Sequence, residues 1–244
     1  MKKKAARTPA RTEPKKINLA LQGGGAHGAF TWGVLDRLLD DTRLQVEGIV
    51  GTSAGAVNAA ILAYGLEAGG PEKAKELLRR FWEINSKNGR CSPFQPTVFD
   101  KILGSKGSIE YSPCWQMFDI LSRMFSPYQW NPGHTNVFKD ILEELIDFRV
   151  LQKARHVKLF ICATNVLTGR LKVFENAEIT PEMILASACL PYLYQAPEIN
   201  GEYYWDGGYM GNPPIFPVIY NTGCQDVLIV QINPINIPEV PRSA

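Results

Sequence analysis

Short apolar runs and stretches with helical spacing alternate along the first third of the chain. Apolar runs at 17–22 and 46–50 predict two strands. Residues 29–40 and 54–66 carry apolar side chains at helical spacing, and a charged amphipathic helix is predicted over 72–84 after a Gly-Gly-Pro break. Strand–helix–strand–helix at this spacing is typical of an α/β fold with a parallel sheet.

The later part of the chain continues this pattern in two groups of elements. Helices are predicted over 136–146 and 181–189, the second of which stops at a Leu-Pro pair. Strands are predicted over 157–163, 170–174, 201–205 and 226–232, and the last of these has the apolar composition of a buried strand.

Residues 86–135 differ from the rest because Ser, Pro, Gly and aromatic residues are frequent there. Trp115, Phe118, Leu121 and Phe125 are spaced three, three and four apart, so they share one face of a predicted helix. Apolar stripes usually face a core, and packing on the core is the expected arrangement. The alternative is that residues 86–135 form a cap that borders an apolar cleft or touches a membrane. In that case the cap is an insertion in a single domain, which spans residues 17–244.

Composition places the chain among ordinary globular proteins. Of 244 residues, 45% are hydrophobic and 20% are charged. The longest apolar stretch, 55–66, is interrupted by Asn58 and is shorter than the roughly 18 residues that a membrane-spanning helix needs. The five cysteines are widely spaced, without a C-x-x-C pair, which argues against a disulfide framework or a zinc site. A reducing, cytoplasmic compartment suits them, and no metal or other cofactor is expected.

Positive charge is concentrated at the start of the chain. The net charge is +2, but residues 1–16 carry seven Lys or Arg against one Glu, which is +6 there and −4 for the remainder. A disordered basic tail is the plain prediction. A tether to anionic lipid is the sharper one, since each Lys or Arg near such a surface contributes roughly 1 kcal/mol. Nucleic acid is not an expected partner, because the rest of the chain is acidic and has no basic-aromatic stripe.

Ser53 lies in the pentapeptide Gly51-Thr52-Ser53-Ala54-Gly55, between the strand at 46–50 and the helix at 54–66. A sharp turn of small residues between a strand and a helix is the setting of a nucleophile elbow. Small neighbours let the strand and the helix pack closely, and the helix N-terminus favours developing negative charge. The pattern therefore predicts a serine hydrolase.

A glycine-rich loop, Gly23-Gly24-Gly25-Ala26-His27-Gly28, connects the first strand to the first helix. Converging backbone N–H groups in such a loop can hold an anion, and beside Ser53 the anion would be the oxyanion of a tetrahedral intermediate. The loop also matches the dinucleotide fingerprint, but the acidic residue expected at the end of the second strand is missing. A phosphate-binding P-loop is excluded, since the required Lys-Ser/Thr pair is replaced by Ala-Phe.

A nucleophilic serine needs a base, and the three histidines are poor candidates. His134 lies in a predicted turn, His156 stands at a strand edge among charged residues, and His27 lies inside the glycine loop. Asp206 is the better candidate, because it ends a predicted strand and is followed by Gly207 and Gly208. An ordinary Asp-Gly turn is the alternative for these residues.

The glycine loop at 23–28, the G-x-S-x-G motif at 51–55 and the D-G-G motif at 206–208 resemble, in this order, the patatin-like phospholipase family. The helix before Leu190-Pro191 and the segment Ala163-Thr164-Asn165 are also similar to that family. The resemblance covers about 17–232. It implies a three-layer α/β/α sandwich with a mostly parallel central sheet, and lipid acyl esters as substrates.

The resemblance also implies the roles of individual residues. Ser53 would be the nucleophile and Asp206 the base of a dyad without histidine. The oxyanion hole would come from Gly24 and Gly25 with the neighbouring amides of the loop. His27 departs from the family, which usually has Arg or Lys there, and is expected to be a structural substitute. The chain also ends soon after Ile232, where related chains often continue, so a truncated C-terminus is expected.

Two other functions stay open beside lipid ester hydrolysis, in addition to the nucleotide binding that the glycine loop formally matches. An acyltransferase could use the same dyad and the same acyl-enzyme. A catalytically inactive lipid-binding protein is the second alternative, although the intact Ser53 and Asp206 argue against it. The head group, the acyl chain and the oligomeric state are not encoded in any pattern of the sequence.

Overall fold

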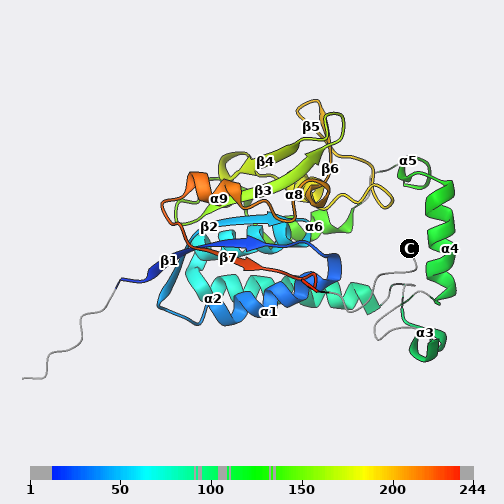
Figure 1. Ribbon diagram of the computed structural model, residues 1–244, viewed down its shortest axis with the longest axis horizontal. Coiled ribbons are helices and arrows are strands. Elements are labelled where there is room, and N and C mark those ends of the chain that lie inside the picture. Colours follow the sequence, from blue (N-terminus) through cyan, green and yellow to red (C-terminus); the bar gives the residue numbers. More distant parts are fainter. Residues whose placement is uncertain are drawn as a thin grey trace, which may run out of the picture.

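A mostly parallel sheet forms the centre of the fold, in the strand order β5-β6-β3-β2-β1-β7, with β4 paired to β3 (Figure 1). The computed structural model describes residues 13–90, 92, 95–103, 109, 111–131, 133 and 136–236. Strands β7, β1, β2 and β3 run parallel, whereas β4 and β6 run antiparallel to β3. The strands are β1 (Lys15–Leu21), β2 (Leu44–Thr52), β3 (Lys158–Asn165), β4 (Leu171–Glu175), β5 (Glu198–Ile199), β6 (Glu202–Asp206) and β7 (Val227–Val230).

Helices cover both faces of this sheet, which confirms the predicted three-layer arrangement. The main core lies between one face and helices that include α1, α2, α6 and α8, while α9 packs on the other face. The helices are α1 (Gly28–Leu38), α2 (Ala54–Arg90), α3 (Val98–Leu103), α4 (Pro113–Met124), α5 (Pro127–Trp130), α6 (Val137–Leu145), α7 (Phe148–Gln152), α8 (Pro181–Ser187) and α9 (Phe216–Asn221). Short 3₁₀ turns are η1 (Gly25–His27), η2 (Asn176–Glu178) and η3 (Gly207–Tyr209).

Helix α2 is a hairpin of two helical segments. Its backbone leaves the helical region at Gly70, where φ is 76°, directly before Pro71. The indole N–H of Trp82 donates to the side chain of Asn58 at 3.0 Å, although these residues would be about 36 Å apart in a straight helix. The amide of Asn58 in turn donates to the carbonyl of Gly28, which ties both halves of α2 to the start of α1.

Three expectations from the sequence need correction. Strand β1 begins at Lys15, so the last two residues of the predicted tail belong to the sheet, while 1–12 lie outside the described residues. Strand β7 is only partly buried: it is an edge strand in which Leu228 and Ile229 are half exposed, and Val230 alone is buried. Helix α4 does not pack on the core, since none of its residues is buried.

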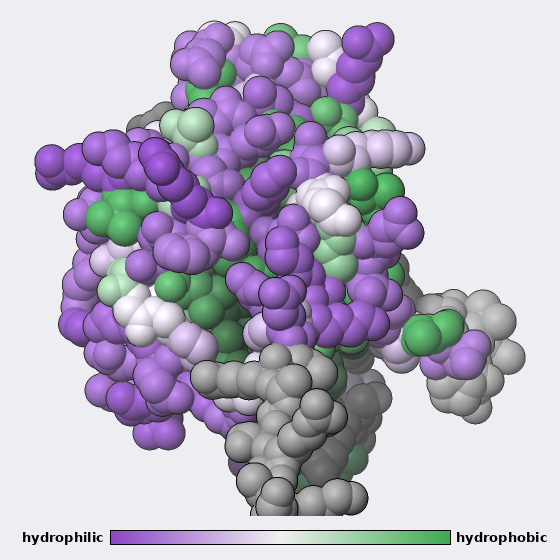
Figure 2. Space-filling view, turned by 90° about the vertical axis from the view of Figure 1, so that its left-hand side faces the viewer, coloured by the Kyte–Doolittle hydropathy of each residue, from purple (hydrophilic) through white to green (hydrophobic). Residues whose placement is uncertain are grey.

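Helices α3, α4 and α5 stand apart from the sheet at one end of the molecule, toward which the carboxyl ends of β1 and β2 point (Figure 1). Large apolar side chains are exposed on all three helices, and the more prominent ones are Val98, Phe99, Ile102, Met117, Ile120, Met124 and Tyr128. The opposite end of the molecule is mostly hydrophilic, with apolar side chains in a hollow and in small scattered patches (Figure 2). No helix in the described part of the chain is long and apolar enough to cross a membrane.

Candidate active site

Ser53 occupies a strained turn between β2 and α2. Its φ is 55°, a left-handed conformation that side chains other than glycine rarely adopt. The turn is tight because its flanking glycines touch backbone: a Cβ on Gly51 would overlap the carbonyl of Gly55, and one on Gly55 would overlap that of Leu21. Such strain persists only where the surroundings impose it, and it is frequent at active sites. The half-buried Ser53 thus lies in a strained turn between a strand and a helix.

The glycine-rich loop lies directly against this elbow. A Cβ on Gly23 would come within 2.6 Å of both the Cβ of Ser53 and the carbonyl oxygen of Thr52. Gly25 has φ 55° and opens η1, which leads into the first turn of α1 at Gly28. The loop therefore brings backbone amides and a helix N-terminus to the side of the serine, an arrangement suited to holding an oxyanion.

Asn212, which the sequence reasoning missed, fixes the glycine loop. Its side-chain oxygen accepts the N–H of Gly23 at 2.6 Å, and its amide donates to the carbonyl of Gly23 at 3.3 Å. Gln22 donates to the backbone carbonyl of Asn212 and accepts the N–H groups of Ile232 and Asn233. The loop after the D-G-G motif thus holds the loop after β1, although about 190 residues separate them in sequence.

Asp206 is the last residue of β6 and lies beside the elbow. It is buried, its carboxyl group accepts the N–H of Gly208 at 2.7 Å, and it is close enough to the Ser53 hydroxyl group for that group to lower its pKa. Gly207 has no room for a side chain, because a Cβ there would overlap the carbonyl oxygen of Cys162 on β3. The glycines of this motif let the backbone turn closely beneath the carboxyl group.

Burial raises the pKa of Asp206 above its ordinary value of 3.8, while the hydrogen bonds from Gly208 and Ser53 lower it, and the net shift is upward. Loss of water disfavours the charged carboxylate, whereas both hydrogen bonds favour it. A carboxyl group with a raised pKa is a stronger base once it is deprotonated. The environment of Asp206 therefore suits proton transfer from a neighbouring hydroxyl group.

The two described histidines are not placed as a base for Ser53. His156 precedes β3, at the amino end of the strand, and its Nδ1 lies 2.7 Å from a carboxylate oxygen of Glu67. His27 is exposed, and its Nδ1 lies 3.3 Å from the carbonyl oxygen of Gly24. His134 lies outside the described residues. Among the described residues, no group of three His, Cys, Asp or Glu side chains is arranged to hold a metal ion.

Of the four described cysteines, Cys162 and Cys189 are buried, Cys114 is exposed and Cys224 is partly exposed. Burial raises the pKa of both buried thiols to about 12, so they stay neutral. Cys91 lies outside the described residues. The two buried cysteines behave as small apolar side chains next to the site.

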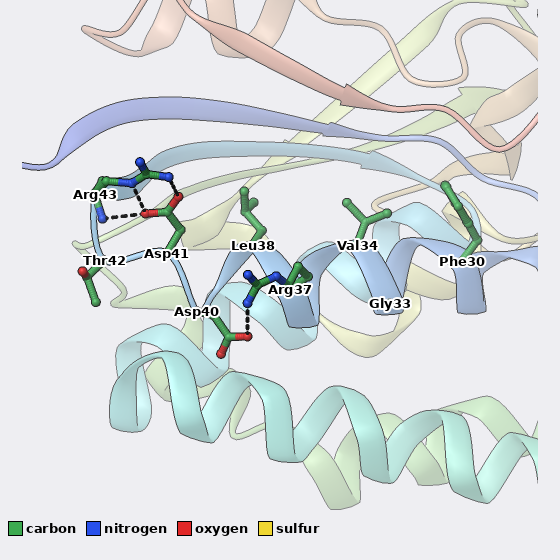
Figure 3. A pocket seen from close by; sticks show the side chains of 9 residues that line it. All are labelled: Phe30, Gly33, Val34, Arg37, Leu38, Asp40, Asp41, Thr42 and Arg43. Carbon is green, nitrogen blue, oxygen red and sulfur yellow. Dashed lines mark hydrogen bonds and ion pairs between the residues drawn. The ribbon is translucent and has the colours of Figure 1, made fainter.

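Of two hollows on the surface of the described residues, one lies near Asp206 and the other does not. A groove of about 900 Å³ runs along α1, where Arg37 and Arg43 pair with neighbouring aspartates; none of its lining residues belongs to the candidate site (Figure 3). A smaller hollow of about 350 Å³ lies between 122–127 and the pair Pro191-Tyr192. Pro191 and Tyr192 follow Cys189, whose carbonyl accepts the backbone N–H of Asp206 at 2.8 Å, which places this second hollow near the site.

Comparisons with known proteins agree with these motifs. The family model described as patatin-like phospholipase matches residues 19–219. The lysophospholipase NTE1 of two strains of Cryptococcus neoformans var. neoformans serotype D is 26% identical over 235 residues, which is 95% of this chain and 12% of the relative. The chain thus spans about an eighth of those relatives. The crystal structure of VipD from Legionella pneumophila is similar with a TM-score of 0.50 and 18% identity, over 88% of this chain and 49% of that one.

Proposed function

Because the chain belongs to the patatin-like phospholipase family, we propose that it hydrolyses acyl esters of lipids, with Ser53 as nucleophile and Asp206 as general base. The observation that carries this proposal is the position of a buried carboxyl group, Asp206, beside Ser53 at a strained elbow: the next residue, Gly207, packs against Thr52, and the Ser53 hydroxyl group affects the pKa of Asp206. A serine and a buried carboxyl group in contact form a nucleophile–base pair without a histidine.

The reaction begins when the hydroxyl oxygen of Ser53 attacks the carbonyl carbon of the ester and its proton passes to the carboxylate of Asp206. The tetrahedral intermediate then collapses: the bond to the leaving alcohol breaks, and Asp206 returns the proton to the alcohol oxygen. Water attacks the resulting acyl-Ser53, again losing a proton to Asp206. The second collapse releases the fatty acid and gives the proton back to the oxygen of Ser53.

Each tetrahedral intermediate carries a negative oxygen, which the glycine loop is positioned to stabilise. Gly24 and Gly25 of this loop would supply the donors beside Ser53, since the N–H of Gly23 is already bound to Asn212. Loss of one donor from such a site typically costs about 10²–10³ in rate. The two hydrogen bonds between Asn212 and Gly23 hold the start of the loop against the elbow.

A lipid as substrate is supported by the apolar surface of α3–α5. These helices expose large apolar side chains at the end of the molecule toward which β1 and β2 point, and the opposite end is mostly hydrophilic (Figures 1 and 2). The hollow near Tyr192 is lined in part by Met124, Phe125 and Pro127 from this segment. An aggregated lipid surface could contact α3–α5 while one acyl chain enters the neighbouring site.

The test is hydrolysis of a panel of phospholipids, lysophospholipids and short-chain esters by the parent, Ser53→Ala and Asp206→Asn. Hydrolysis by the parent alone is expected. Transfer of the acyl group to an added alcohol, in preference to water, would favour the acyltransferase. Absence of turnover by the parent on every lipid ester would refute the proposed activity and favour the inactive lipid-binding protein.

A further inference from the structure

Ser187, the last residue of α8, makes two hydrogen bonds at the base of the elbow. Its side chain is fully buried, with 0% exposure. The hydroxyl group donates to the carbonyl of Cys162 on β3 at 2.6 Å and accepts the backbone N–H of Ser53 at 3.0 Å. A hydroxyl has one donor and two acceptor positions, so it makes both bonds at once, and together they fix its orientation.

The backbone N–H of Ser53 needs such a partner. Ser53 directly precedes α2, and the first amides of a helix have no acceptor within the helix. Its own carbonyl already accepts the N–H groups of Ala56 and Val57. The hydroxyl group of Ser187 therefore satisfies the one remaining backbone group of the residue that holds the strained φ of 55°.

The same short segment also holds the other member of the dyad. The carbonyl of Cys189, two residues after Ser187, accepts the backbone N–H of Asp206 at 2.8 Å. The hydroxyl of Thr164 on β3 donates to the carbonyl of Asp206 at 2.9 Å. Residues 187–189 thus bind the backbones of both Ser53 and Asp206, and the bond from Ser187 to Cys162 anchors that segment to β3.

We propose that Ser187 is a positioning residue, whose hydroxyl group holds the backbone of Ser53 so that the Ser53 side chain stays on the carboxylate of Asp206. The proposal rests on the proposed function of the dyad. Ser187 touches neither substrate nor the reacting oxygen, and it acts through the conformation of the elbow. Without the hydroxyl group of Ser187, the backbone N–H of Ser53 loses its hydrogen-bond partner. The left-handed turn can then relax, and the Ser53 hydroxyl group can move away from Asp206.

The Ser187→Ala variant tests this role in the whole chain. We expect kcat on a soluble short-chain ester to fall about 10²-fold, since a displacement of about 1 Å can have that effect, while KM stays within about twofold. The Ser53 hydrogen bond lowers the pKa of Asp206, so its loss should move the acid limb of the rate profile to higher pH. A purely structural residue would lower thermal stability and leave both the kcat per folded molecule and the acid limb unchanged.

Thr222→Ala is the matched control. The hydroxyl group of Thr222 is likewise both donor and acceptor: it donates to the carbonyls of Val218 at 2.7 Å and Cys224 at 3.1 Å, and it accepts from Asn18 at 2.8 Å. It follows α9, on the face of the sheet opposite to α8. Both variants should lose thermal stability, and Ser187→Ala alone should lose kcat. If Ser187→Ala does not fold, Ser187→Cys serves instead, because a thiol leaves no cavity at this position but is a weak donor and acceptor.

Titration of active molecules with a fluorophosphonate normalises every rate. The role of Ser187 would be overturned if the parent hydrolyses the ester and a folded Ser187→Ala or Ser187→Cys variant has the same kcat and the same acid limb. A parent that neither reacts with the fluorophosphonate nor hydrolyses any ester would instead refute the function of the dyad. The two failures are therefore distinguishable.

Discussion

Replacing Gly23 by alanine should impair catalysis by pushing the glycine loop away from Ser53. The new Cβ would lie 2.6 Å from the Cβ of Ser53, whereas ordinary contacts begin at 3.4 Å, so loop or elbow must shift by about 0.8 Å. A shift of about this size at a reacting group can cost 10²-fold in rate. We therefore expect kcat to fall about 10²-fold, together with a loss of about 1–3 kcal/mol in the free energy of unfolding from overpacking.

The assay is steady-state hydrolysis of a soluble short-chain ester, normalised to the folded fraction. Gly33→Ala is the control, because Gly33 is inside α1 and a Cβ added there would meet no described neighbour within 4 Å, Ser53 included. It should keep the parent kcat and gain up to about 1 kcal/mol in the free energy of unfolding. A Gly23→Ala variant with a kcat within twofold of the parent would refute the inferred contact between loop and elbow.

Two further predictions concern pH and the lipid surface. The acid limb of kcat/KM should lie above pH 3.8, because burial raises the pKa of the base Asp206. The neighbouring Cys189, Tyr192 and Tyr209 have raised pKa values, so they stay neutral at this pH and do not contribute to the limb. A limb at or below pH 3.8 would contradict the assignment of Asp206 as the base. Replacing both Met117 and Ile120, which are 58% and 54% exposed on α4 and do not line the hollow near Tyr192, by Glu should reduce hydrolysis of phospholipid vesicles tenfold or more. Hydrolysis of a soluble ester should stay unchanged, since burial of each side chain in lipid is worth about 1.5–3 kcal/mol only where a lipid surface is present. Tyr220→Glu is the control, because Tyr220 is 79% exposed but lies on α9; this variant should keep its activity on vesicles and on the soluble ester. Equal vesicle hydrolysis by the parent and all variants would exclude contact between α4 and lipid.

Local patterns were sufficient for the part of the fold that carries the nucleophile. The apolar runs before and the helical spacing after Ser53 predict β2, the turn and the start of α2, and the structure has all three. The Gly-Gly-Pro break likewise predicts the kink at Gly70. These features depend on residues that are neighbours in the sequence, so the local sequence is sufficient to predict them.

Features that depend on distant parts of the chain could not be predicted in the same way. The apolar spacing of α4 is equally compatible with packing on a core and with an exposed surface, and only the tertiary structure separates the two. Strand β7 has the composition of a buried strand, but its position at the sheet edge depends on strand order. Asn212 and Ser187 reach the site through contacts across more than 130 residues, and no local pattern marks such contacts.

The most direct test of the Ser53–Asp206 dyad is intact-mass analysis after reaction with a fluorophosphonate, followed by peptide mapping. The account predicts one adduct, on Ser53, for the parent, no adduct for Ser53→Ala, and labelling slowed by about 10²–10⁴ for Asp206→Asn, as expected for loss of a general base. An adduct on another residue of the parent, or lipid hydrolysis that survives in Ser53→Ala, would contradict it.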